Sequence, residues 1–189
     1  ICTFTNGGTP KKSVEKYWRG EIPFITGADI DEENGIITEP RGFITEEAMK
    51  HSSTNLILPT SILLVTRTGV GKVAIPPFPV CVSQDFTAIS FDSGRINQRF
   101  LYHYLRRAKK DFVRQARGAT IQGITRAVVS NYELKLPELE EQQRIAAILD
   151  KADEVEREAA KIQEMREDII QAMFSDMFGD PVTNPKGWN

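Results

Sequence analysis

Two segments of the chain suggest phosphate or methyl-transfer chemistry, but each lacks a residue on which that chemistry depends. TGVGK at residues 68–72 resembles the end of a phosphate-binding loop. That loop requires a glycine where Thr66 stands and a serine or threonine where Val73 stands. IPPF at residues 75–78 resembles a tetrapeptide that holds the target amino group in some methyltransferases, but Ile75 offers no hydrogen-bond acceptor. We therefore expect a hairpin turn at the first segment and no cofactor site at the second.

The other side chains that could support catalysis are scattered along the chain. His51 and His103 are the two histidines, and they are too far apart in sequence to form a metal-binding motif. His103 lies among aromatic residues and is expected to be a packing residue. Ser13, Ser61 and Ser83 lack the strand-turn-helix setting of a nucleophile. The sequence thus predicts a protein that has no metal, no cofactor and no catalytic residues of its own.

Positive charge is concentrated between Arg95 and Arg126, where nine lysines and arginines accompany a single acidic residue, Asp111. A solvated helix face normally mixes charges of both signs, so this segment favours an anionic partner. The phosphates of a nucleic acid would be attracted and positioned by such cations. Shorter polar side chains in the following loop, Thr120 and Gln122, are suited to contacts with bases.

The net charge changes sign along the chain. Residues 1–137 have 18 Lys and Arg against 13 Asp and Glu, a net charge of +5, and residues 138–178 have 5 against 12, a net charge of −7. This asymmetry indicates an anionic partner for the first part only.

Composition indicates the cellular setting. Cys2 and Cys81 are too few for a disulfide framework and are expected to be buried free thiols. No run approaches the roughly 20 apolar residues of a membrane span. These features predict a cytoplasmic protein that has no membrane partner.

Apolar patterning predicts a body of mixed α and β structure. Short helical turns are expected at residues 13–18, after the capping residue Thr45, and in the segment 118–131. A longer helix is expected from Asn97 to Arg117, with Gly118 as its stop. Strands are expected in five places: residues 1–5, 22–26, a hairpin at 61–75, one or two strands in 80–91, and an edge strand at 132–136.

A much longer helix is predicted from residue 140 to 178, because no proline or glycine interrupts this segment. It would span roughly 58 Å at about 1.5 Å per residue. Its apolar positions repeat in alternating steps of three and four residues, which is the heptad seam of a coiled coil. The alternative, a helix folded back on its own body, would show a wider apolar stripe. The seam consists of Ile145, Ile148, Ala152, Val155, Ala159, Ile162, Arg166, Ile169 and Met173.

The order of several short segments resembles the specificity subunit of type I restriction-modification enzymes. The match covers nearly the whole chain, and the order of the segments is more specific than any one of them. The segments are GGTP at Gly7–Pro10, Tyr17–Ile30, Ile44–Ser53, Leu58–Ile75, Ser83–Ile89 and Thr120–Asp153.

The resemblance implies an α+β fold in which a target-recognition domain that contains a mixed sheet is followed by one long helix. In this family two such repeats occur, the two helices pair antiparallel, and each domain recognises one half of a split DNA site. Methyltransferase subunits that bind S-adenosylmethionine dock around the paired helices. By this resemblance, residues 1–137 are a DNA-binding domain, 138–178 a spacer and dimerisation helix, and 179–189 a tail leading toward a further domain.

The chain has one domain and one helix, so we expect a natural half-subunit or a piece of a longer chain. Its expected partners are double-stranded DNA, methyltransferase and restriction subunits, and a second copy or a different half that pairs through the seam. Two alternatives are a recognition module of a solitary or fused modification enzyme and a coiled-coil adaptor that does not bind DNA. From charge and loop position, the predicted DNA-binding residues are Lys11, Lys12, Arg67, Thr68, Lys72, Arg114, Arg117, Thr120, Gln122 and Arg126.

Overall fold

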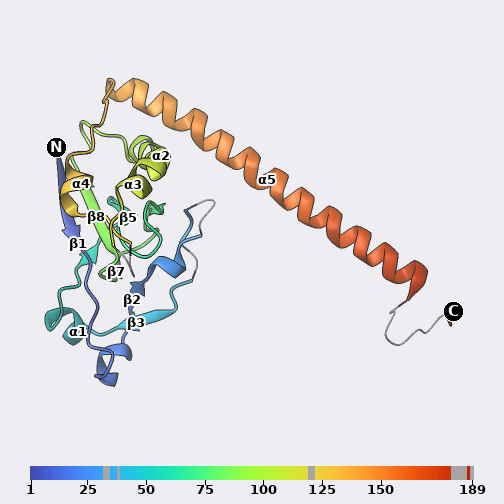
Figure 1. The fold of residues 1–189 in the computed structure, drawn as a ribbon, viewed down its shortest axis with the longest axis horizontal. Helices are drawn as coiled ribbons and strands as arrows, with labels where there is room; N and C mark the ends of the chain where they lie inside the picture. Colours follow the sequence, from blue (N-terminus) through green and yellow to red (C-terminus); the bar gives the residue numbers. More distant parts are fainter. Residues whose placement is uncertain (32–34, 38, 119–121, 180–186, 188–189) are drawn as a thin grey trace. The chain divides into compact units, whose positions relative to one another are not determined.

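The structure, a computed structural model, describes residues 1–31, 35–37, 39–118, 122–179 and 187. The chain forms two compact units, Ile1–Ala146 and Ala147–Asn189. The first unit contains both β-sheets and the start of helix α5 (Leu139–Phe178), and the second contains the rest of that helix (Figure 1). The predicted α+β class is confirmed.

The first sheet is antiparallel throughout, with strand order β1–β8–β5–β6. Its central strand β5 is buried at all four residues, because successive side chains point to opposite faces and both faces are covered. Ile62 and Leu64 belong to one core, and Leu63 and Val65 to another. The hairpin predicted at 61–75 is confirmed by β5 and β6. The strands are β1 (Cys2–Asn6), β5 (Ile62–Val65), β6 (Val73–Ala74) and β8 (Phe86–Phe91).

The second sheet is mixed, with strand order β3–β2–β7–β4. β2 and β7 run parallel, and the two outer pairs are antiparallel. The strands are β2 (Ile22–Ile25), β3 (Gly42–Ile44), β4 (Leu56–Ile57) and β7 (Val80–Val82).

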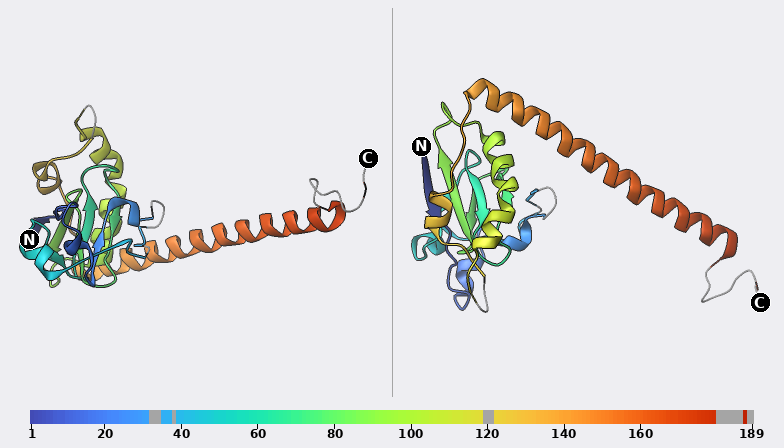
Figure 2. Two further views of the ribbon diagram at one scale, coloured as in Figure 1. Left: turned by 90° about the horizontal axis from the view of Figure 1, so that it is seen from below. Right: turned by 45° about the horizontal axis from the view of Figure 1, so that its top comes forward.

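The two sheets pack on each other, and helices cover the free face of the first sheet (Figure 2). The core between the sheets includes Ile25 and Val82 from the second sheet and Phe86 from the first. On the other face of the first sheet, Leu101 and Phe112 pack from helices α2 (Gln98–Arg107) and α3 (Lys109–Gln115). The first sheet therefore has one core on each of its faces.

Short helical segments complete the first unit. The cap predicted at Thr45 is confirmed, since the Ala48 amide donates to its hydroxyl oxygen at 3.2 Å at the start of α1 (Glu46–Lys50). The remaining segments are η1 (Glu15–Trp18), η2 (Gly27–Asp29) and α4 (Arg126–Ser130), which lies beside β1 in Figure 1.

The single helix predicted from Asn97 to Arg117 is wrong, because the chain forms two helices that meet at Ala108. Ala108 is buried, and with its ψ of −7° it is both the C-cap of one helix and the N-cap of the next. No glycine or proline marks the break. Both helices nevertheless pack on one core, which is why the apolar stripe continues across it.

The edge strand predicted at residues 132–136 is also absent from the structure. Tyr132, Leu134 and Leu136 do pack against the helix-covered core, which explains their alternation. The backbone between them is held by a side chain instead of a strand: the Tyr104 hydroxyl donates to the Glu133 carbonyl at 3.0 Å. One-sided packing therefore produced a strand-like pattern in a segment without strand pairing.

The two cysteines are both free. Cys81 is fully buried in β7, and burial raises the pKa of its thiol, as expected for an unreactive packing residue. Cys2 is only half-buried, so the prediction of two buried thiols holds for Cys81 alone.

The long helix predicted from the sequence is confirmed as α5, which is 40 residues long. None of the helices in the described part of the chain has the length and apolar character needed to span a membrane. The pairing of α5 with another helix stays a prediction.

Candidate nucleic-acid interface

The turn between β5 and β6 has an unusual backbone. Gly69 and Gly71 have φ values of 107° and 90°, in the region that glycine tolerates best. Thr68 has a φ of 50°, which is costly for a β-branched residue. The turn is anchored by the Asp85 carbonyl, which accepts hydrogen bonds from the amides of Thr66 at 2.7 Å and Arg67 at 3.2 Å. Residues 68–72 are thus a hairpin turn, as predicted, and Thr68 is held exposed at its tip.

A second segment pairs with this turn across about fifty residues of sequence. Gly123 forms bridges with both Arg67 and Arg117, and the Gln122 carbonyl accepts from the Thr68 amide at 3.4 Å. A Cβ atom on Gly123 would lie 3.0 Å from Arg67 Cγ, so the close approach favours glycine. We call Arg67, Thr68, Arg117 and Gln122 the basic loop cluster.

The side chains of the basic loop cluster are available to a partner. Thr68, Arg117 and Gln122 are exposed, and Arg67 is half-buried. Two guanidinium groups can contact phosphates, and the Gln122 amide and Thr68 hydroxyl can contact base edges. The predicted residue Thr120 lies outside the described residues.

Lys72 lies at the end of the same turn and lines a small cavity of about 180 Å³. Arg106 and Lys109, two cations that were not among the predicted site residues, line the same cavity together with Asp31. The structure therefore extends the positive charge from the hairpin to the junction of α2 and α3.

The other predicted DNA-binding residues are held by contacts outside the basic loop cluster. Arg114 on α3 lies 3.5 Å from Asp111. Arg126 at the start of α4 lies 6.0 Å from the Phe4 ring. The Lys11 carbonyl accepts from the Val14 amide and the Trp18 indole, which places Lys11 and Lys12 beside η1. The structure thus brings four of the predicted site residues together in one cluster, with Lys72 at the end of its hairpin turn. Arg114, Arg126 and the pair Lys11 and Lys12 lie at three other positions.

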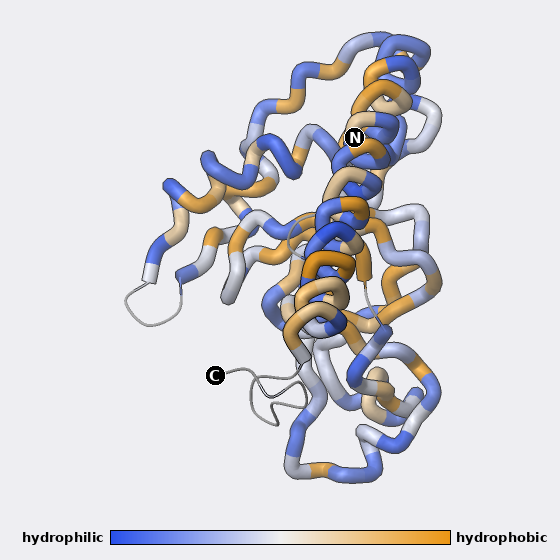
Figure 3. Tube along the Cα trace, turned by 90° about the vertical axis from the view of Figure 1, so that its right-hand side faces the viewer, coloured by the Kyte–Doolittle hydropathy of each residue, from blue (hydrophilic) through white to orange (hydrophobic). Residues whose placement is uncertain are grey.

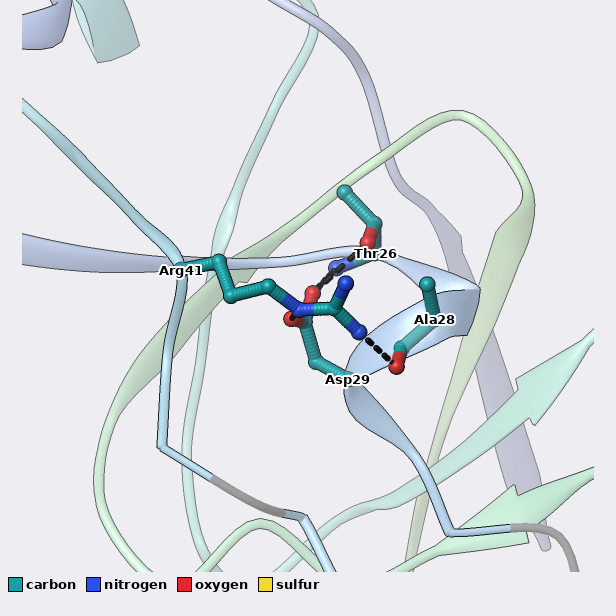
Figure 4. Close-up of polar contacts among 4 residues, drawn as sticks. All are labelled: Thr26, Ala28, Asp29 and Arg41. Atoms are coloured by element: carbon teal, nitrogen blue, oxygen red, sulfur yellow. Dashed lines mark hydrogen bonds and ion pairs between the residues drawn. The ribbon is translucent and has the colours of Figure 1, made fainter. Parts of the chain in front are cut away.

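One further cation could not be identified as a candidate from the sequence pattern. Arg41 precedes β3 and pairs with Asp29, a carboxylate that is 1% exposed (Figure 4). The only local signal was the spacing of Thr26 and Asp29, which is that of a helix cap. Its pairing with Arg41 depends on the tertiary structure.

A family model described as the type I restriction modification DNA specificity domain matches residues 1–167. The chain belongs to this family. The match includes the basic loop cluster, Arg41 and most of α5.

Two curated relatives are specificity subunits. That of the type I restriction enzyme MjaIX from Methanocaldococcus jannaschii is 29% identical over 205 residues, which cover 100% of this chain and 48% of the relative. That of EcoR124I/EcoR124II from Escherichia coli is 32% identical over 160 residues, which cover 81% of this chain and 39% of the relative. The chain therefore spans less than half the length of these two proteins.

Solved structures share the fold of this specificity-domain chain. A chain from a structure on complex assembly and conformational transition of the type I restriction-modification system has a TM-score of 0.72 at 22% identity, covering 92% of this chain and 41% of that one. The HsdS subunit from Thermoanaerobacter tengcongensis has a TM-score of 0.64 at 21% identity, covering 87% and 37%.

Membership of the type I specificity family confirms the expectation of a DNA specificity component. In the described part of the chain, no group of three or more His, Cys, Asp or Glu residues is placed to hold a metal ion.

The predicted seam of this specificity-family chain is largely exposed along α5. Ile148, Val155, Ile162, Ile169 and Met173 have 53–62% of their surface exposed, and Ile145 is half-buried. Apolar residues recur along the helix in Figure 3. The structure adds exposed apolar residues that the sequence analysis missed, mainly near the end of the helix: Leu149, Met165, Ile170, Phe174, Met177 and Phe178.

Proposed function

We propose that the unit Ile1–Ala146 binds duplex DNA and recognises one half of a bipartite target for a type I restriction-modification complex. In this proposal α5 pairs with the helix of a second copy or of another half. Methyltransferase subunits that bind S-adenosylmethionine dock on the pair, and the restriction subunit joins them. The chain itself supplies specificity and performs no chemical step.

The basic loop cluster carries the DNA-binding part of this proposal. Two loops that are distant in sequence pair through their backbones and so bring together two arginines, a glutamine and a threonine. Cations supply sequence-independent affinity through the phosphates, and shorter polar groups supply discrimination between bases. The strained backbone of Thr68 supports the assignment, because such strain is common where a side chain has a functional position.

The docking part of the proposal is supported by the exposed apolar seam of α5 and by the family of the chain. A structure on assembly of the type I restriction-modification system has a chain with the same fold. Exposed isoleucines that repeat in heptads favour a helical partner over solvent.

Replacing both Arg67 and Arg117 by alanine is expected to weaken DNA binding to a similar degree for all sequences. Each lost phosphate contact should reduce the slope of log K against log salt by about 0.9. Gln122→Ala should leave the slope unchanged and reduce discrimination by about 1–3 kcal/mol at the base pair that it contacts. Titration of labelled duplexes at several salt concentrations measures both quantities.

Arg19→Ala is the control for these variants, because Arg19 is an exposed arginine that pairs with Glu15 and is not part of the cluster. It should leave affinity and salt slope unchanged. If the Arg67 and Arg117 variant also binds with unchanged affinity and slope, the proposed contact surface is wrong. Absence of salt-dependent DNA binding in the unchanged chain would favour the adaptor alternative.

A further inference from the structure

A buried carboxylate at the end of η2 holds an exposed guanidinium. Asp29 is 1% exposed, and its Oδ2 accepts hydrogen bonds from the Thr26 amide at 2.7 Å and the Thr26 hydroxyl at 2.6 Å. Its Oδ1 accepts from Arg41 Nε at 2.7 Å. Because Asp29 is fixed by these backbone and side-chain bonds, it is a rigid support for Arg41 (Figure 4).

One edge of the Arg41 guanidinium is held, and the opposite edge is not. Nε donates to Asp29 and Nη2 donates to the Ala28 carbonyl, and these two nitrogens lie on the same edge of the group. Within the part of the chain that the structure describes, Nη1 makes no hydrogen bond or ion pair. The Arg41 side chain is 66% exposed. The outward N–H groups of Nη1 and Nη2 therefore form a fixed, parallel pair of donors.

This donor pair belongs to the same region as the hairpin tip. η2, which includes Ala28 and Asp29, begins at Gly27. A Cβ atom on Gly27 would lie 3.5 Å from the Thr68 carbonyl oxygen, an ordinary contact distance. The first residue of the η2 turn that supports Arg41 thus lies beside the backbone of Thr68 in the basic loop cluster.

The net charge of the Arg41–Asp29 pair indicates whether Arg41 is suited to a phosphate or to a base. Attraction to DNA phosphates depends on net positive charge, and the Asp29 carboxylate offsets that of Arg41. The direction of the free N–H groups is unaffected by this compensation. A fixed pair of donors in a neutral ion pair is therefore better suited to a base edge than to a phosphate.

We propose that Arg41 recognises a guanine in the major groove, with Nη1 and Nη2 donating to its O6 and N7 atoms, and that Asp29 is its positioning residue. This inference rests on the proposed DNA-binding function and adds a specificity-determining residue to it. Arg67 and Arg117 supply attraction to the backbone, and Arg41 supplies discrimination.

The test begins with selection of preferred sites by the unchanged chain from a library of random duplexes. The selected duplex and a scrambled duplex of the same composition are then the probes for all variants. Arg41→Lys keeps the charge but loses the planar donor pair. We expect its affinity for the scrambled duplex to stay within about twofold, and its preference for the selected duplex to fall about tenfold or more. In the sites that this variant selects, one position should no longer show a preference for a G·C pair.

Two further variants separate recognition from folding. Asp29→Asn combined with Arg41→Gln replaces the ion pair by two neutral amides and should show the same loss of preference with a folded domain. Asp29→Asn alone should lose part of the preference, although Arg41 is present. Arg19→Lys is the matched control, since its partner Glu15 is as exposed as Arg19 itself, and its preference should not change. Thermal unfolding of each variant reports on the fold.

Each contrary outcome has a distinct meaning. If Arg41→Lys selects the same sites with the same preference, Arg41 does not recognise a base and the inference is wrong. It is equally wrong if the double variant loses affinity for both duplexes alike with a smaller salt slope, because that result identifies a phosphate contact. If the unchanged chain selects no sequence, the proposed function fails, and the assignment of Arg41 fails with it.

Discussion

Replacing Gln142 by leucine is expected to lower the free energy of unfolding of the first unit by about 3 kcal/mol. Gln142 lies in the second turn of α5 and has no exposed surface. Its Oε1 accepts from the Asn97 amide at 2.9 Å, and its Nε2 donates to the carbonyls of Arg95 at 3.0 Å and Pro137 at 2.8 Å. Leucine has a similar size but leaves all three backbone groups without this partner. Each buried polar group left unpaired costs about 1–3 kcal/mol.

Thermal or denaturant unfolding measures this loss, which corresponds to roughly 2–4 °C in Tm per kcal/mol for a chain of this size. The neighbouring Gln143 is exposed and provides the matched control. Gln143→Leu should change stability by less than about 0.5 kcal/mol. Equal effects of the two substitutions would show that the three hydrogen bonds of Gln142 do not stabilise the unit.

Gln142→Glu adds a pH dependence whose sign follows from the same contacts. The introduced carboxyl would face the Arg95 and Pro137 carbonyl oxygens in a buried site, so its pKa in the folded state is raised above the unfolded value. A group whose pKa is higher in the folded state than in the unfolded state stabilises the fold fully at a pH below its unfolded-state pKa. This contribution is lost as the pH rises through its folded-state pKa. The deficit relative to the unchanged chain should therefore be small near about pH 4 and increase toward neutral pH.

Ile148→Asp combined with Ile162→Asp is expected to convert self-associated chains into monomers. Both residues lie on the seam of α5, with 56% and 62% of their surface exposed. Burial of an isoleucine contributes roughly 1.5 kcal/mol or more, and a pair of identical chains loses four of them. The dissociation constant should rise by about four orders of magnitude, since each 1.4 kcal/mol corresponds to about tenfold. Sedimentation velocity over a range of concentrations measures this change.

Gln171→Asp is the control for this experiment, because Gln171 lies on the face of α5 opposite the seam and is exposed. It should leave self-association unchanged. Arg166 on the seam should weaken the pair while restricting its register, so Arg166→Leu should associate more strongly. An unchanged chain that is monomeric at high concentration would contradict pairing of two identical copies and favour a seam that pairs with another protein.

Local sequence patterns were sufficient for the elements whose signals lie within one segment of the chain. The heptad repeat and the absence of glycine and proline predicted α5, which the structure places at Leu139–Phe178. The two apolar runs at 61–75 predicted the β5–β6 hairpin, and Thr45 predicted the cap of α1. These features follow from contacts between residues that are close in sequence, so the sequence of each segment determined them.

Features that depend on distant partners were decided by the tertiary structure. The alternation of apolar and polar residues at 132–136 reflects packing of one side of the segment against the core. The backbone of this segment is hydrogen-bonded by the hydroxyl of Tyr104 and not by a neighbouring strand. The apolar stripe from Asn97 to Arg117 arises because both helices pack on the same core. No glycine or proline in the sequence marks the break between them at Ala108.

Some properties of the candidate site are local to the sequence, and others depend on the tertiary structure. Charge and loop position made Arg67, Thr68, Arg117 and Gln122 candidate DNA-binding residues from the sequence alone, because charge and position in a turn are local properties. Their assembly into one cluster required the pairing of Gly123 with both loops. Arg41 was not among these candidates, because its orientation comes from a buried carboxylate on another element, and the sequence does not show which distant charge will be desolvated beside it. Sequence periodicity determines which faces are buried, and only the folded chain decides which loops meet.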